Sequence, residues 1–279
     1  MWFDALHSGR RAALAAEVTA RSYKVFIRDR QHRDWLAEFP ELAGRAVRAV
    51  DGHQLAHACH AARDRKGGLI PVGFLYGLCL HTGLQRSLVP FQVDGARRHE
   101  WPVFKQQLPG WLRQDRGAKA PIVVGDPAYI DVAHRAEQKR TRLALIITRE
   151  KENMKPTFIA RHAYDPADPA DPVDRGVEAD EIAGYTCAYM RRIVYRDPAG
   201  GEQFVFPTTE DSLRPGVIAR RYLLRRKIEK VSDVFKNKQQ QRKARANGGT
   251  AAATQAHLTA LAHNLLALFA RRSGTGRPG

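Results

Sequence analysis

Cysteine is scarce in this chain of 279 residues, which contains only Cys59, Cys79 and Cys187. No two of them form a C-x-x-C pair, so the sequence offers neither a disulfide framework nor the usual ligand spacing of a structural zinc site. No apolar run reaches the roughly 18 residues that a membrane-spanning helix needs. The first residues, MWFDALHSGRR, also lack the pattern of a secretory signal. We therefore expect a protein of a reducing, cytoplasmic compartment.

Acidic residues are outnumbered, because the chain has 29 Asp and Glu against 46 Lys and Arg. The resulting net charge is +17 and the pI is near 10.2. Charge of this size concerns partners rather than fold, and it indicates a polyanion. Composition alone does not distinguish a nucleoid-associated protein that binds DNA from a basic protein that associates with ribosomes. The hydrophobic content of 43% is sufficient for the core of one large domain or two small ones.

Helical and strand-like patterns alternate along the chain. The pattern predicts helices over residues 4–38, 99–114, 130–141, 214–245 and 251–271. Strands are expected at the short apolar runs, namely at 45–53, 68–78, 87–95, 120–129, 142–148, 185–197 and 202–209. This order predicts an α/β fold with an RNase H-like mixed sheet flanked by helices, and with a β-rich insertion before the last major helices.

The expected organisation has five segments. Residues 1–44 form an N-terminal helical segment, which would be a shortened DNA-binding region, and residues 45–150 form the first part of the core. Residues 151–210 form the β-rich insertion, residues 211–271 the second part of the core with its two helices, and residues 272–279 a disordered tail. Within the insertion, the proline-punctuated acidic run DPADPADPVD can form neither a helix nor an interior strand, so we expect a solvated loop there.

The helix expected from Gly216 to Lys238 concentrates polar groups on one side. At about 100° per residue, Tyr222, Arg225, Glu229 and Lys236 share one stripe, whereas apolar side chains occupy the opposite face. The helix could be a solvated amphipathic helix in which Glu229 only pairs with neighbours such as Arg225. Alternatively, Glu229 could be a metal-binding carboxylate whose flanking cations hold phosphates.

Two aspartates stand at the ends of expected strands. Asp51 closes the first strand in AVDGH, and Asp126 ends the fourth in VVGDPAY, with Tyr129 three residues later. An acid at the carboxyl end of a buried strand is well placed to bind a ligand, because the backbone there opens toward solvent. Each aspartate alone could equally be a residue that starts a turn.

The four polar residues of the helix fit the pattern Y-x2-R-x3-E-x6-K without a gap. Together with Asp51 and Asp126 upstream, this pattern resembles the signature of the IS-four family of bacterial insertion-sequence transposases. The resemblance covers roughly residues 45–270 and implies a DDE transposase with an RNase H-like catalytic core. It implies that Asp51, Asp126 and Glu229 are the catalytic, metal-binding acids. Tyr222, Arg225 and Lys236 would contact DNA phosphates near the scissile position.

The implied chemistry is hydrolysis at the transposon ends, followed by attack of the exposed 3′-hydroxyl on target DNA. Three carboxylates suit Mg²⁺, for which Mn²⁺ could substitute, and two such ions can activate the attacking oxygen and stabilise the leaving one. The expected partner is double-stranded DNA, bound by a homodimer on paired ends. Four apolar residues near the carboxyl end, Leu258, Leu261, Leu265 and Phe269, predict a helix used for core packing or for self-association.

Two positions depart from the family pattern. Arg226 replaces the tryptophan that commonly follows the signature arginine, and His53 replaces a small hydroxyl residue after Asp-Gly. His53, His57 and His60 could suggest zinc, although no familiar fourth ligand is near them in the sequence. Two alternatives to a transposase stay open. One is a truncated or inactive remnant that only binds DNA, and the other is an RNase H-like nuclease that never joins strands.

Overall fold

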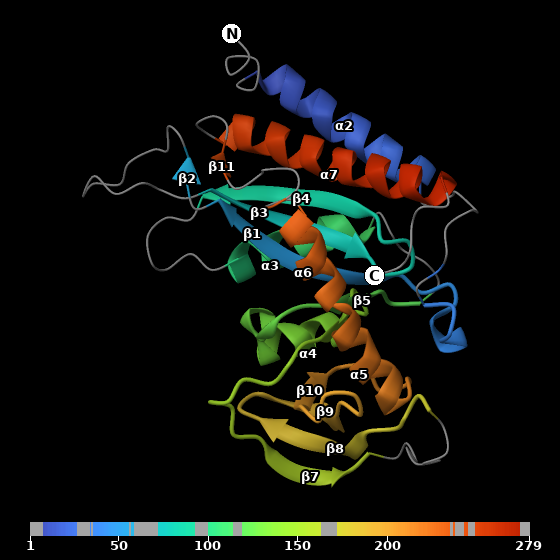
Figure 1. Cartoon of the computed structure of the whole chain (residues 1–279). Helices are drawn as coiled ribbons and strands as arrows, with labels where there is room; N and C mark the ends of the chain where they lie inside the picture. The colour runs from blue at the N-terminus through green and yellow to red at the C-terminus, as the bar shows by residue number, and fades with distance from the viewer. Residues whose placement is uncertain are drawn as a thin grey trace. The chain divides into compact units, whose positions relative to one another are not determined.

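The computed structural model describes residues 8–26, 34, 36–55, 57–58, 72–92, 100–113, 119–162, 172–234, 237, 243–244 and 249–273 (Figure 1). The chain divides into two compact units. The first unit comprises residues 1–37, 50–111 and 227–279, and the second comprises residues 38–49 and 112–226. Strand β1 (Val47–Leu55) therefore begins in the second unit and continues in the first.

The first unit contains the strand order β4-β3-β1, in which β3 (Val72–Cys79) and β4 (Gln85–Gln92) form an antiparallel hairpin. Residues Phe74 to Leu80 of this hairpin are buried. A short parallel pair joins β2 (His57–Ala58) and β11 (Lys243–Ala244). Helix α3 (Glu100–Arg113) packs the Trp111 ring so close to Gly77 of β3 that a Cβ there would lie 2.5 Å from it.

Two helices of the first unit, α2 (Gly9–Phe26) and α7 (Gly249–Arg272), run side by side in the same direction, and α7 lies along β4 (Figure 1). Thr19 Oγ1 donates to the His257 carbonyl at 3.1 Å. Phe26 of α2 and Ala267 of α7 both pack against one apolar cluster, formed by Tyr23, Cys79 and Leu84. The fully buried Asn264 amide exchanges two hydrogen bonds of 2.7 Å with the backbone of Gln85. Polar recognition as well as apolar packing therefore fixes α7 on the hairpin.

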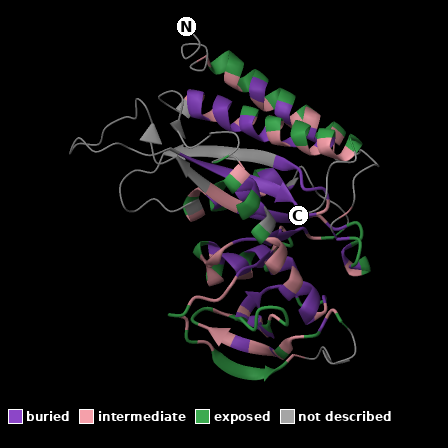
Figure 2. Ribbon diagram, in the orientation of Figure 1, coloured by how far each residue is buried: buried purple, intermediate pink, exposed green. Residues whose placement is uncertain are grey.

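The second unit contains a mixed sheet in the order β1-β5-β6-β10-β9-β8-β7. The start of β1, β5 (Ile122–Val124) and β6 (Leu145–Ile147) are parallel, and β5 is buried along its whole length. The remaining strands are antiparallel: β10 (Gln203–Thr208), β9 (Ala188–Arg196), β8 (Val177–Tyr185) and β7 (Thr157–Arg161). Every residue of β7 is exposed (Figure 2).

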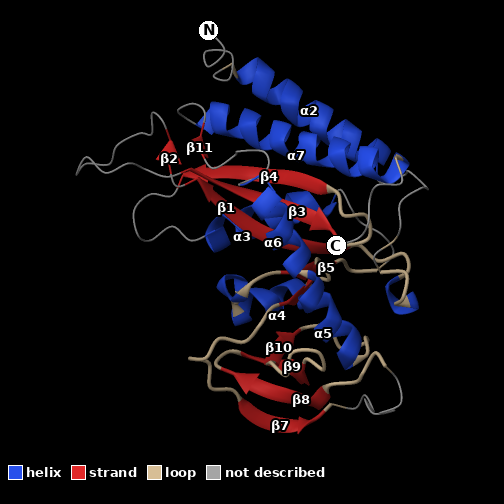
Figure 3. Cartoon of the chain, viewed as in Figure 1, coloured by secondary structure: helices blue, strands red, loops and turns tan. Residues whose placement is uncertain are grey.

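The second unit also contains helices (Figure 3). These are α4 (Val132–Arg140), α5 (Pro215–Leu224) and the short 3-10 helices η1 (Pro40–Leu42) and η3 (Pro127–Tyr129). The prediction of an α/β fold with a mixed sheet flanked by helices is confirmed, and the topology is consistent with an RNase H-like fold. Strands occur within residues 151–210 as expected, although β7 and β8 were not predicted individually. The expected segment boundaries stay predictions.

The prediction of one unbroken helix over 214–245 is wrong. The helix ends at Leu224, and a new helix, α6 (Arg226–Asp233), begins after Arg225. The Arg225 amide donates to the Tyr222 carbonyl at 2.9 Å, a tightened turn that interrupts the regular helical pattern. Among the described residues, no helix is long and apolar enough to cross a membrane.

Candidate active site

Asp51 is held by a contact with helix α6. Its half-buried side chain lies in the first unit, where Ser232 Oγ donates to Asp51 Oδ2 at 3.5 Å. Glu229 is exposed on the same helix, three residues before Ser232, so it lies within one helical turn of the serine. The expectation that Asp51 closes its strand is wrong, because β1 continues to Leu55.

Asp126 follows β5 and begins the 3-10 helix η3. Its Oδ1 accepts the backbone N–H of Ala128 at 2.7 Å, which orients the carboxylate. Tyr129 is buried, and its side chain would lie 3.1 Å from a Cβ on Gly125. The bare glycine thus allows the tyrosine to pack under the turn, which explains the Gly-Asp-Pro-x-Tyr order in this chain.

The register of β1 and β5 gives the two aspartates equivalent positions in their strands. Val47 pairs with Ile122, Arg48 with Val123 and Ala49 with Val124. Asp51 and Asp126 each come two residues after the last pair, at the carboxyl ends of the paired segments. Such ends are where open parallel sheets present ligand-binding groups.

The helical stripe predicted that Tyr222 lies on an exposed polar face, but it does not. Its side chain is buried in the second unit, where its ring centroid is 4.8 Å from that of Phe206 and 6.4 Å from that of Phe204. The Arg225 guanidinium lies 5.6 Å from the tyrosine ring centroid. Burial raises the pKa of Tyr222, and the nearby charge of Arg225 opposes this increase. The phenol therefore stays protonated and can act only as a neutral hydrogen-bonding group.

Asp126, Tyr222 and Arg149 are electrostatic neighbours in the second unit. The negative charge of Asp126 contributes to the raised pKa of Tyr222, while the positive charge of Arg149 lowers it. Arg149 also lines a cavity of about 600 Å³, together with Pro127, Lys151, Asn153 and Gln203. This cavity, whose lining also includes the acids Glu150 and Glu152, therefore adjoins the residue that follows Asp126.

Asp51, Asp126 and Glu229 each carry the oxygen donors that a hard divalent cation prefers. Asp51 is a half-buried carboxylate within β1, Asp126 is a half-buried carboxylate two residues after β5, and Glu229 is an exposed carboxylate on α6. Among the described residues, Asp126 Oδ2 accepts no hydrogen bond, so this oxygen is available to a cation. This donor chemistry fits Mg²⁺. In the described part of the chain, however, no three His, Cys, Asp or Glu side chains form a group that could hold a metal ion.

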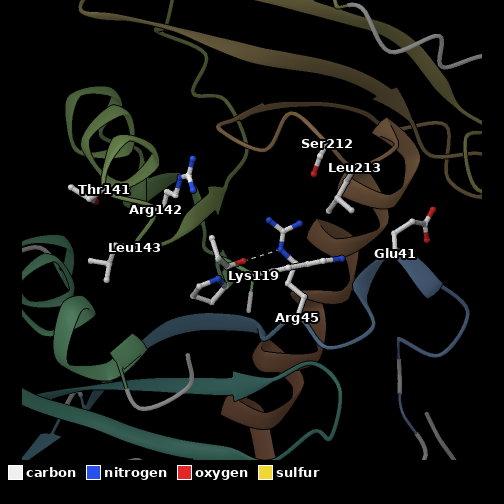
Figure 4. A pocket seen from close by; sticks show the side chains of 10 residues that line it. Glu41, Arg45, Lys119, Thr141, Arg142, Leu143, Ser212 and Leu213 are labelled. Atoms are coloured by element: carbon white, nitrogen blue, oxygen red, sulfur yellow. Dashed lines mark hydrogen bonds between the residues drawn. The ribbon is translucent and has the colours of Figure 1, made fainter. Parts of the chain in front are cut away.

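A larger cavity, of about 810 Å³, lies elsewhere in the second unit (Figure 4). Arg45, Pro121 and Leu143, which precede β1, β5 and β6, line it, so it lies at the amino-terminal ends of these strands. Arg45 donates to the Ala120 carbonyl at 2.8 Å and forms a buried 2.5 Å ion pair with Glu210. Arg45, the most buried cation that lines this cavity, is thus bonded within the protein. The cavity also lies at the opposite ends of the strands from the aspartates, so it does not belong to their site.

Some expected site residues lie outside the described part of the structure. Lys236 is among them, as is His60, and the side chains of His53 and His57 are not described either. The zinc alternative for these histidines therefore stays untested. Sequence reasoning did not identify Ser232 or Arg149. The only available signal was that Ser232 follows Glu229 by three residues and that Arg149 follows an apolar strand.

No curated protein matches this chain. A solved structure, the cryo-EM structure of a piggyBac transposase synaptic complex with hairpin DNA, is similar with a TM-score of 0.41 and 9% sequence identity. The match covers 80% of this chain and 48% of that chain, so this chain spans about half the length of that transposase. The family described as the transposase DDE domain matches residues 44–265, and the chain therefore belongs to the DDE transposase family.

Proposed function

We propose that this protein is a DNA transposase that cleaves DNA at transposon ends and joins the resulting 3′-hydroxyl to target DNA. The observation that carries the proposal is that Asp51 and Asp126 each follow the last residue pair of β1 and β5 by two residues. The contact of Ser232, on the helix of Glu229, with Asp51 supports it. Family membership gives these acids a common purpose. We assign the chain more narrowly to the IS-four group, because its four-residue signature is complete.

In this proposal Asp51, Asp126 and Glu229 act together as ligands of Mg²⁺, or of Mn²⁺ in its place. The bound metal would supply activation of the attacking oxygen and stabilisation of the leaving oxygen. The Ala128 N–H orients the Asp126 carboxylate at 2.7 Å, so this side chain needs little reorganisation on binding, whereas the 3.5 Å contact of Ser232 constrains Asp51 only weakly.

The cations of the site would bind the DNA backbone. Arg225 and Lys236 suit phosphate oxygens, and the protonated Tyr222 hydroxyl suits a single hydrogen bond to one of them. Since the tyrosine ring is buried, we expect it also to support the turn at Arg225.

Self-association on paired DNA ends completes the proposal. On α7 the side chains of Leu258, Leu265 and Phe269 are 46%, 50% and 70% exposed, which excludes core packing within the chain for these three. The sequence left core packing and self-association open, and for these three residues we propose the second, a homodimer contact. Sedimentation of the parent chain with and without DNA would measure it directly.

The test is cleavage of a labelled duplex that carries the element's own terminal repeat, in Mg²⁺ or Mn²⁺. We expect Asp51→Asn, Asp126→Asn and Glu229→Gln each to abolish cutting while DNA binding persists, because only the metal ligand is lost. Asp233→Asn is the matched control, since Asp233 is also an exposed acid on α6. Cutting that survives Glu229→Gln would sink its assignment as a ligand.

Assays of cutting, joining and binding also distinguish two alternative functions. An RNase H-like nuclease would cut but would not join pre-cut ends to a target duplex. A remnant that only binds DNA would retain salt-sensitive binding with no metal-dependent cutting in any variant.

A further inference from the structure

A pair of arginines near Asp126 shares one carboxylate that belongs to neither the core nor the proposed metal site. Arg149 Nη1 lies 3.4 Å from Glu202 Oε1, and Arg226 Nη2 lies 3.6 Å from Glu202 Oε2. All three residues belong to the second unit and are between 41% and 57% exposed. The site is thus a two-cation position filled by a single anion of the protein itself.

The arginines are oriented by an aromatic ring. The guanidinium of Arg149 lies 5.2 Å from the Phe204 ring centroid, and that of Arg226 lies 5.9 Å from it. Phe204 is buried and stacks on Phe206, at 6.0 Å between centroids, so it is a fixed support. Stacking of this kind holds the plane of a guanidinium while its N–H groups stay available to an anion.

The Glu202 carboxylate is held weakly. Both of its ion-pair distances exceed the roughly 2.7–2.9 Å of a strong charge-assisted hydrogen bond. Glu202 follows the exposed turn 198–201, whose Gly201 has a φ of +70° that favours glycine. An exposed and weakly held carboxylate is readily displaced by an anion that carries more charge and more acceptor oxygens.

The surroundings suit a DNA strand. The 600 Å³ cavity beside Pro127 is lined by Arg149, Lys151 and Asn153. The one acid on this lining that is largely buried, Glu150, is already neutralised, because Arg192 donates to it from two nitrogens and Tyr185 donates at 2.7 Å. Lys151 adds a further cation to this lining, and the exposed Glu152 next to it offsets that charge, so the positive charge of the position comes from Arg149 and Arg226.

We propose that Arg149 and Arg226 bind one phosphate of the DNA strand, and that this phosphate replaces the Glu202 carboxylate. The proposal rests on the proposed DNA transposase function, and it adds a binding position outside the four-residue signature. Arg226 occupies the place of the family's common tryptophan, and here its guanidinium lies over Phe204. In the protein without DNA, the Glu202 carboxylate would occupy the phosphate position. Glu202 would therefore compete with DNA and weaken its binding.

The test is the affinity for the terminal-repeat duplex, measured by fluorescence anisotropy in chelator so that cleavage plays no part. We expect Arg149→Gln and Arg226→Gln each to weaken binding several-fold and to reduce the slope of log Kd against log salt by about one. Glu202→Gln should instead tighten binding. This gain should disappear when it is combined with Arg149→Gln and Arg226→Gln.

The matched controls are Glu137→Gln and Arg140→Gln, an exposed pair of comparable chemistry at the carboxyl end of α4. They correct for the general effect of changing net charge. Equal effects of Glu202→Gln and Glu137→Gln, or an unchanged salt slope for Arg149→Gln, would overturn the phosphate position while leaving the transposase proposal intact. Failure of the parent chain to bind any duplex would overturn both.

Discussion

The Asp180 and Arg191 side chains, both fully buried, form a two-point ion pair between β8 and β9. Arg191 Nε donates to Oδ1 at 2.8 Å, and Nη2 donates to Oδ2 at 2.6 Å. The third nitrogen of Arg191 donates to the Leu213 carbonyl at 2.6 Å. Leu213 lies two residues before the first residue of α5, so this single guanidinium ties the sheet of the second unit to the start of the helix that carries Tyr222.

We predict that Asp180→Ala lowers the free energy of unfolding by about 3–5 kcal/mol, because it leaves the Arg191 charge buried without a counter-charge. Urea denaturation measures this loss. Glu178→Gln is the control, since the Glu178–Arg196 ion pair also joins β8 and β9 but is partly exposed, and its loss should be much smaller. Equal losses for the two variants would contradict the argument from burial.

The two aspartates proposed as metal ligands occur in local patterns that survive folding. Asp51 and Asp126 follow short, valine-rich runs, and these runs do form the paired segments of β1 and β5. The position of Tyr222 was not predictable in this way. A helical stripe assumes a continuous helix, and no glycine or proline announces the break at Arg225. The packing of the Tyr222 ring on Phe206 is a long-range contact that local periodicity does not report.

Among helices and strands, α7 is an element whose extent the sequence predicts and whose buried face it does not. Its expected range of 251–271 is close to the observed Gly249–Arg272. The buried face, however, carries small residues such as Ala252, Ala256 and Ala260, whereas large apolar side chains point outward. Small side chains allow α2 and β4 to approach closely. Hydrophobicity alone therefore does not identify the buried face of this helix.

His263 makes the docking of α7 sensitive to pH. Its Nε2 lies 3.2 Å from the Gly83 carbonyl, to which it donates, at the turn between β3 and β4. Loss of surrounding water lowers the pKa of His263 below its ordinary 6.5, the Gly83 carbonyl opposes the shift, and Arg271 adds to it. The folded protein therefore favours the neutral ring.

We predict that stability falls as the pH is lowered below about 6.5. Above that value the ring is neutral in both states, so His263 adds no pH dependence. Below it the unfolded chain takes up a proton that the folded chain refuses, until the lowered folded pKa is reached. Urea denaturation from pH 5 to pH 7.5 should show a flatter profile for His263→Gln, whose amide can still donate to Gly83.

A second histidine provides the comparison for this experiment. Burial, followed by the charge of Arg191, lowers the pKa of His162, which lies in the second unit. His162→Gln should therefore remove a further part of the same acid sensitivity, and the double variant should be flattest. A profile that is identical in the parent chain and in His263→Gln would exclude the proposed role of the α7 contact.

At the scale of the whole chain, composition gives the net charge but not the order of the strands. The antiparallel strands β7 to β10 continue the second unit's sheet through the pairing of Thr208 with Ile147, a connection between distant segments that composition cannot supply. The net charge of +17, in contrast, needs no structure to be read. It governs encounter with a polyanion rather than the arrangement of strands.

We predict that binding of the parent chain to its terminal-repeat duplex weakens steeply and linearly in log Kd against log salt. A protein that contacts about 6–10 phosphates loses roughly 10³–10⁵ in affinity between about 50 and 200 mM salt, because condensed counterions are released on binding. Titrations at four or more salt concentrations, in chelator, measure the slope. Glu229→Gln should show the same slope as the parent, since a metal ligand takes no part in this electrostatic term. A scrambled duplex that binds as tightly as the terminal repeat at every salt concentration would mean that charge alone, and not end recognition, accounts for the affinity of this chain.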